Sequence, residues 1–223
     1  RLFYIQAVKH DVLPLDNSKV ERLDVRNRPS LTRGRDTFTY YDGMIRIPEG
    51  SAPDVKNKSF GISAVVDVPD GGCEGLLMTQ GGRFCGLGLY VLKGKPVFVY
   101  NLADVERYRV ESDEPLKPGK HVVTLDFKYD GDGIGKGGQA TLSVDGTKVD
   151  SQRFPRTIGF RMSLDETLDI GEDTGTPVSE DYKVPFRFNG ELEKVTIKIT
   201  DHPLTEEQLQ KYRESQVKAA LSR

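Results

Sequence analysis

Between residues 36 and 200, apolar and polar residues recur in short runs that turn residues separate. In Thr141–Asp145 the apolar residues take every second position, and Leu192, Val195, Ile197 and Ile199 follow a similar pattern. Alternation with a period of two is typical of a strand with one buried face. The pattern predicts strands at Thr37–Tyr41, Met44–Ile47, Phe60–Val68, Glu74–Gln80, Leu87–Leu92, Pro96–Tyr100, Val105–Val110, His121–Tyr129, Gln139–Val144, Thr147–Phe154 and Glu191–Thr200.

The connections between these runs indicate an antiparallel, all-β fold. Asp145-Gly146 stands between two alternating strands, which is the strongest short-range signal for a hairpin. No helical segment separates the strands, so βαβ units are excluded. The sequence therefore predicts an antiparallel β-sandwich or jelly roll, with one long loop over residues 154 to 191 that crosses between the two sheets.

Three regions are expected along the chain. Residues 1–35 are predicted to hold the end of a helix, over residues 1 to 9, and then an extended connector marked by Pro14, Pro29 and a lack of periodicity. Residues 36–200 form the β-sandwich domain. Residues 201–223 are predicted to form one C-terminal helix, because Thr205 and Gln208 make a capping-box pattern.

The composition argues against two kinds of partner, nucleic acids and membranes. The chain has 223 residues, 36% of them hydrophobic, so a sizeable core is expected. Its 32 basic and 34 acidic residues nearly balance, which does not favour binding to nucleic acid. No apolar run approaches the ~18 to 20 residues of a membrane span, and no signal peptide is recognisable. Because the chain opens without Met, we expect it to be a piece of a longer protein.

The two cysteines, Cys73 and Cys85, are too few for a disulfide scaffold or a zinc site. On the predicted hairpin they would lie at opposite ends of a strand, ~20 Å apart, which is beyond the reach of a disulfide. We expect two free thiols.

The stretch from Leu168 to Tyr182 is unusually acidic. It contains Asp169, Glu172, Asp173, Glu180 and Asp181. Such carboxylates could simply solvate a surface loop, hold a Ca²⁺ ion through residues such as Asp169, Glu172 and Asp173, or supply a glycosidase-type acid pair. The absence of tryptophan, a common platform for sugar rings, argues against the glycosidase. The solvated, stiff loop is the preferred interpretation.

Other motifs give weaker signals. Arg83 and Phe84 stand on a glycine-rich turn, where they are candidates for contact with an anion or partner, although a plain hairpin turn would also explain them. Gly133–Gly138 matches the string GxGxxG but lies between two strands, so it is predicted to be a hairpin loop and not a nucleotide site. An EF-hand over Asp130–Thr141 is excluded because Thr141 takes the place of the final carboxylate.

Several segments together resemble the C-terminal region of bacterial arylsulfatases. They are Val12–Asp16, Phe38–Pro48, Gln80–Phe84, Val99–Leu102 with Glu106–Tyr108, Gly135–Gly138 and Asp169–Ser179. The resemblance covers about residues 10 to 200 and departs from the family at Cys73, at Cys85 and in the C-terminal helix. It implies a concanavalin-like jelly roll and a bacterial protein that is periplasmic or secreted.

The same resemblance implies that the catalytic domain precedes this region. A sulfatase needs a Cys or Ser that becomes formylglycine, within Cys/Ser-x-Pro/Ala-x-Arg, and a cluster of side chains for a divalent metal. Neither is present, so the implied role is a non-catalytic accessory domain that docks on a missing N-terminal sulfatase domain or supports homo-oligomer contacts. The alternatives are a carbohydrate-binding module, with or without Ca²⁺, and a glycan-cleaving enzyme that uses the carboxylates of residues 169 to 181.

These three roles predict different surfaces. A docking domain should expose apolar side chains around the connector. A glycan module should present Tyr or Phe rings beside polar groups. An enzyme needs two carboxyl groups within ~5 to 10 Å of each other in a cleft.

Overall fold

The computed structural model describes residues 1–13, 31–131 and 133–200. The chain separates into two compact units, of which the larger spans Leu31–Pro203. The helix α1 (Leu2–Lys9) belongs to the smaller unit and confirms the helix expected over residues 1 to 9. Most of the predicted connector and the whole predicted C-terminal helix lie outside the described residues. In the part of the chain that the structure describes, no helix is both long and apolar enough to cross a membrane.

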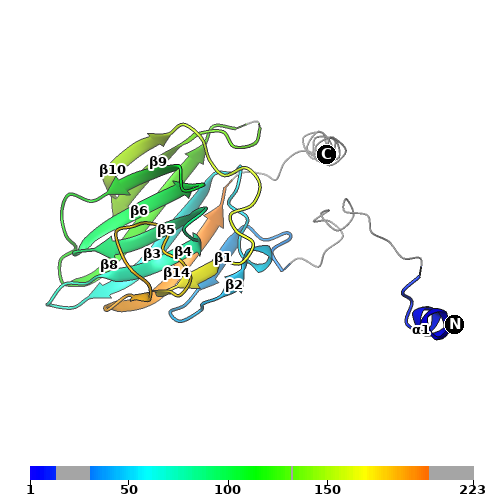
Figure 1. Cartoon of the computed structure of the whole chain (residues 1–223). Helices are drawn as coiled ribbons and strands as arrows, with labels where there is room; N and C mark the ends of the chain where they lie inside the picture. The colour runs from blue at the N-terminus through cyan, green and yellow to red at the C-terminus, as the bar shows by residue number, and fades with distance from the viewer. Residues whose placement is uncertain (14–30, 132, 201–223) are drawn as a thin grey trace. The chain divides into compact units, whose positions relative to one another are not determined.

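The larger unit is an antiparallel β-sandwich, as predicted, with two sheets that lie face to face (Figure 1). The six-stranded sheet has the order β1-β14-β3-β8-β9-β10. Its strands are β1 (Thr37–Tyr40), β14 (Glu191–Ile199), β3 (Phe60–Val68), β8 (Gly119–Tyr129), β9 (Gly138–Val144) and β10 (Thr147–Phe154). Thr37 pairs with Lys198, so the two ends of the domain are joined in one sheet.

The eight-stranded sheet has the order β12-β13-β4-β5-β6-β7, and β11 adds to β4 and carries β2. Its strands are β2 (Ile47–Pro48), β4 (Gly75–Gly81), β5 (Gly86–Leu92), β6 (Lys95–Leu102), β7 (Glu106–Glu111), β11 (Thr167–Ile170), β12 (Glu172–Asp173) and β13 (Phe186–Arg187). A short 3-10 helix, η2 (Glu49–Ser51), follows β2.

Burial explains why the strand sequences of the two sheets look different. In β3 every second residue is buried, because one face meets the core and the other is less covered. In β4 every residue is buried, because both of its faces are covered. The main core lies between the sheets and contains, among others, Phe98, Phe127 and Phe154.

The second face of β4, β5 and β6 is covered by residues 176–186, which we call the flap. Val178 and Tyr182 of the flap pack with Tyr90, Val97 and Val99 in a separate apolar cluster. Flap residue Asp181 accepts a hydrogen bond from the Tyr90 hydroxyl at 2.5 Å. The flap therefore closes the face of this sheet that would otherwise meet solvent.

The Asp145-Gly146 hairpin forms as predicted, with positive φ at both residues, 51° and 77°. A positive φ at both central residues is what a tight two-residue hairpin turn requires, and glycine adopts it without strain. Asp145 strengthens the turn, because its carboxylate accepts a hydrogen bond from the Val122 amide at 2.8 Å.

Three sequence expectations are wrong. Residues 154–191 do cross between the sheets, but they also contain strands β11, β12 and β13, so they are not a plain loop. The acidic stretch is solvated only in part, since Asp169 and Asp173 are each 1% exposed whereas Glu180 and Asp181 lie at the surface. The strand expected over Met44–Ile47 is also reduced to Ile47–Pro48, which pairs with β11.

Candidate functional site

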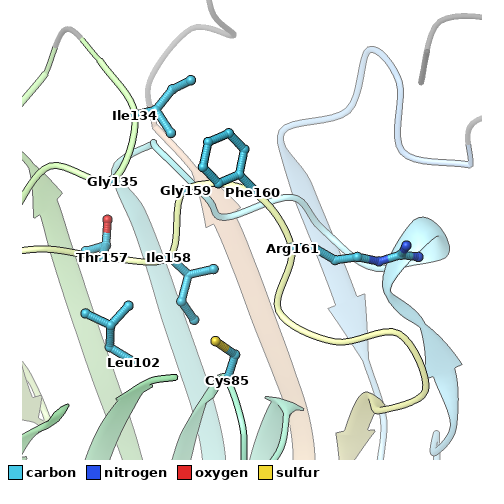
Figure 2. A pocket seen from close by; sticks show the side chains of 9 residues that line it. All are labelled: Cys85, Leu102, Ile134, Gly135, Thr157, Ile158, Gly159, Phe160 and Arg161. Carbon is cyan, nitrogen blue, oxygen red and sulfur yellow. The ribbon is translucent and has the colours of Figure 1, made fainter. Parts of the chain in front are cut away.

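A pocket of about 460 Å³ opens at one end of the sandwich, and we call it the end pocket (Figure 2). It is formed by the β4–β5 turn, the end of β6, the loop between β8 and β9, and the segment that follows β10. Its lining residues are Cys85, Leu102, Ile134, Gly135, Thr157, Ile158, Gly159, Phe160 and Arg161. Both sheets therefore contribute to it.

Asn57 fixes two walls of the end pocket to each other. Its side-chain oxygen accepts a hydrogen bond from the Gly135 amide at 2.8 Å. Its side-chain nitrogen donates to the Gly159 carbonyl oxygen at 2.7 Å. Gly159 is also required by close packing, because a Cβ there would lie 2.4 Å from Ile134 Cγ2.

Buried tyrosine hydroxyls hold the same backbone from the inside. The Tyr129 hydroxyl donates to the Gly133 carbonyl oxygen and accepts from the Lys136 amide, both at 2.8 Å. The Tyr100 hydroxyl accepts a hydrogen bond from the Ile158 amide at 2.9 Å. Because these contacts lie within the protein, the end pocket is formed before any ligand arrives.

The walls of the end pocket are mainly apolar, with one aromatic ring and one cation. Phe160 lines the pocket and is 57% exposed. Arg161 extends away from that ring (Figure 2), and its Nε lies 3.7 Å from a carboxylate oxygen of Glu49. Cys85 supplies a free thiol, and burial raises the pKa of that thiol. An apolar surface with a few polar groups beside it is typical of small-molecule sites.

The sequence candidates Arg83 and Phe84 lie on the β4–β5 turn, directly before the lining residue Cys85. The Arg83 amide donates to Thr176 Oγ1 at 2.9 Å, and its guanidinium lies 3.8 Å from Asp104. Phe84 is 72% exposed. The structure thus places both residues next to the end pocket.

Asp169 has a structural role. Its two carboxylate oxygens accept hydrogen bonds from the Arg46 amide at 2.6 Å, the Thr167 hydroxyl at 2.8 Å, the Thr174 amide at 3.0 Å and the Thr174 hydroxyl at 2.6 Å. Four donors on a buried carboxylate occupy its main acceptor positions. Asp169 therefore joins β11 to the segments on either side of it.

Asp173 and Glu172 point to different partners. Asp173 accepts a hydrogen bond from the Tyr182 hydroxyl at 2.6 Å, and burial raises the pKa of Asp173 to about 6. Glu172 instead pairs with Arg187 at 3.2 Å. Over residues 1–13, 31–131 and 133–200, no three His, Cys, Asp or Glu side chains come together in a group that could hold a metal ion. The geometry gives the Ca²⁺ prediction no support. Of the five candidate carboxylates for an acid pair, Asp169 and Asp173 are buried and have no open cleft around them.

Comparison with known proteins bears on the fold only. No family model and no curated protein matches the chain. Domains LG4-5 of the mouse laminin α1 chain are similar in structure, with a TM-score of 0.50 and 14% identity, over 76% of this chain and 42% of that chain. A Ruminococcus gnavus IT-sialidase module, CBM40, bound to α2,3-sialyllactose, has a TM-score of 0.49 and 15% identity, over 78% of this chain and 94% of that chain.

The laminin likeness shows a shared jelly-roll architecture. This chain corresponds to less than half of the laminin fragment that it matches. At such low identity, a similar fold says nothing about the ligand, so function has to be argued from the site.

Sequence reasoning missed most of the end pocket. Residues 157–161 carry no motif, and they become a wall only because Asn57, 102 residues away from Gly159, holds them in place. One signal was available in the glycine-rich run Gly133–Gly138, which does form the expected hairpin loop and supplies Gly135 to the lining.

Proposed function

We propose that the sandwich is a carbohydrate-binding module that holds part of a saccharide in the end pocket. The observation that carries this proposal is the preformed pocket of about 460 Å³ with the exposed ring of Phe160 on its wall. That volume lies within the range of roughly 300 to 1,000 Å³ that is usual for small-molecule sites. A sugar ring has an apolar C–H face for the aromatic ring and hydroxyl groups for the polar atoms beside it.

We infer that this chain binds without catalysing a reaction. Two carboxylates of the acidic stretch support this view, because Asp169 and Asp173 are buried and accept hydrogen bonds within the protein. The proposal also gives no role to Ca²⁺, since Asp169, Glu172 and Asp173 are already used in internal contacts.

Cys85 provides a direct test, because it lines the end pocket whereas Cys73 is buried elsewhere in the core, where burial raises the Cys73 pKa to about 11. A thiol reagent such as DTNB at pH 8 is expected to modify Cys85 faster than Cys73. A saccharide identified on a glycan array should protect Cys85 from the reagent. A saccharide that binds without protecting Cys85 would place the binding site elsewhere.

Substitution of the aromatic wall tests the same proposal by affinity. Phe160→Ala should weaken saccharide binding roughly tenfold, since an aromatic contact contributes about 1 kcal/mol or more. Leu164→Ala is the matched control, because Leu164 is exposed on the same segment but does not line the end pocket. Calorimetric titration would measure both variants, and equal affinities would contradict the proposal.

A second candidate is the accessory domain of a sulfatase, which docks on a catalytic domain. The exposed apolar side chains of α1, among them Phe3 and Ile5, support this role, as do Tyr41, Met44 and Ile45 near the start of the sandwich. The two roles are compatible in one protein. Failure of every saccharide to bind would leave docking as the remaining role.

A further inference from the structure

Arg161 brings to the end pocket a positive charge that its neighbours do not balance. Its closest carboxylate, Glu49, lies at 3.7 Å, which is longer than a direct hydrogen bond. Glu49 is already occupied, because it pairs with Lys56 at 2.7 Å and accepts hydrogen bonds from the amides of Met162 and Ser163, both at 3.2 Å. Glu49 is therefore paired more closely with Lys56 than with Arg161.

The ion pairs around Arg161 confirm the excess of positive charge. Lys56 also pairs with Asp54 at 2.8 Å, and Lys58 pairs with the same carboxylate at 3.1 Å. The cluster thus contains three cations, Lys56, Lys58 and Arg161, and two carboxylates, Glu49 and Asp54. The lysine side chains are largely covered, whereas that of Arg161 is 54% exposed. The unbalanced charge is therefore carried by the most exposed cation of the cluster, which lines the end pocket while its side chain extends away from the Phe160 ring (Figure 2).

The turn beside the end pocket repeats this arrangement. Arg83 lies 3.8 Å from Asp104, whose carboxylate is engaged much more closely by Arg107. Arg83 is 56% exposed at its side chain. At this end of the sandwich, Arg161 and Arg83 thus each lie near a carboxylate that another cation already neutralises.

We propose that the saccharide bound in the end pocket is anionic, and that Arg161 binds its carboxylate or sulfate group while Phe160 contacts the sugar ring. This inference rests on the proposed function. A guanidinium presents a planar set of donors that fits two oxygens of a carboxylate or sulfate at once. An anionic group would also complete the charge balance that Glu49 leaves unfinished.

The test compares two pairs of oligosaccharides with the full chain. One pair differs by a sulfate ester, and the other has a uronic acid in place of its neutral parent sugar. The anionic member of at least one pair should bind more tightly, and the pair that shows the difference identifies the anionic group. Raising the salt concentration should reduce this preference, because the charges are partly exposed.

Arg161→Gln should lower the affinity for the anionic oligosaccharide roughly ten- to a hundredfold, the usual effect of losing hydrogen bonds to a charged group. Its affinity for the neutral partner should stay unchanged, and Arg161→Lys should retain part of the preference. Arg153→Gln is the matched control, because Arg153 holds both oxygens of Asp130, at 2.7 and 2.5 Å, and does not line the end pocket.

Different outcomes would contradict the preference for anionic saccharides and carbohydrate binding itself. Neutral and anionic oligosaccharides that bind equally well, with no effect of Arg161→Gln, would overturn the anionic preference and leave carbohydrate binding intact. No binding by any of the four oligosaccharides would overturn the proposed function, and the inference with it. An unchanged melting temperature for Arg161→Gln confirms that the variant is folded, which is expected because Glu49 keeps its other partners.

Discussion

Asn101 shows how a single buried side chain positions the candidate site. Its amide nitrogen lies within hydrogen-bonding distance of the carbonyl oxygens of Gly82, Arg83 and Val178, at 3.3, 2.6 and 3.2 Å. Its amide oxygen accepts from the Asp104 amide at 3.1 Å. One side chain therefore joins the β4–β5 turn, the β6–β7 turn and the flap.

Removal of this amide should destabilise the protein and loosen the turn that carries Arg83 and Phe84. Asn101→Ala is expected to lower the free energy of unfolding by roughly 2 to 4 kcal/mol, because several buried backbone groups lose their partner. Urea unfolding would measure the change, and faster modification of Cys85 would report the looser turn.

The exposed Asn189 gives a comparison of the same residue type. Its side chain accepts one hydrogen bond, from the Glu74 amide at 2.8 Å. Asn189→Ala should cost about 1 kcal/mol or less and should not alter the reactivity of Cys85. Equal effects of the two variants would contradict the special role of Asn101.

At the scale of elements, buried carboxylates of the acidic stretch hold short strands in place. Asp169 anchors β11 through the amides and hydroxyls around it, and Asp173 binds the flap through Tyr182. Short strands at the edge of a sheet have few ladder hydrogen bonds, so side-chain acceptors stabilise a segment that backbone pairing alone would hold weakly. The carboxylates serve this structure at the cost of burying charge.

Asp173 should make stability depend on pH in a distinctive way. Its pKa in the folded protein is about 6, above the ordinary value of 3.8, chiefly because of burial. Between about pH 4 and pH 6 the folded state keeps a proton that the unfolded state has lost, so stability falls as pH rises through this window. A shift of about two pKa units corresponds to roughly 3 kcal/mol.

Asp173→Asn should remove this decrease, since an amide does not titrate. Free energies of unfolding at pH 4, 5, 6 and 7 would show it, as the difference between the variant and the wild type. Groups with lowered pKa, such as Asp54 at about 2, lose their contribution below this window and cancel in the difference. A difference that is constant with pH would mean that Asp173 is not the titrating group.

The same elements show what sequence patterns can and cannot predict. The strands β3 and β10 were predicted with correct ends, because their length and flanking turns are encoded locally. The strands β12 and β13 have two residues each, too few to show alternation. They exist because residues distant in sequence pair with them, for instance Arg187 with Leu76. The end pocket was missed for the same reason, since its walls meet only in the folded chain.

At the scale of the whole molecule, the two sheets depend on each other through one core. Phe154, at the end of β10, is fully buried. Its ring lies 4.9 Å from that of Tyr108 in β7 and 6.4 Å from that of Phe98 in β6, both in the other sheet, and 5.7 Å from that of Phe127 in its own sheet. The segment that forms one wall of the end pocket begins directly after Phe154, so core packing and site geometry are linked.

Phe154→Ala should therefore destabilise both sheets and the site together. The expected loss is about 3 to 5 kcal/mol, which is a large part of the stability of an ordinary domain. For a domain of this size the melting temperature should fall by roughly 10 to 15 °C. Phe154→Leu keeps most of the volume and should cost much less.

Two probes distinguish a shared core from two separate ones. Far-ultraviolet circular dichroism reports the strands, and tyrosine fluorescence reports the core in a chain with nine Tyr and no Trp. If the sheets unfold together, both probes should give the same melting temperature in the wild type and the same decrease in Phe154→Ala. Two separate transitions, with a lower melting temperature for only one of them in the variant, would show that the sheets are stabilised independently. In that case the end pocket could lose one wall while the other remains folded.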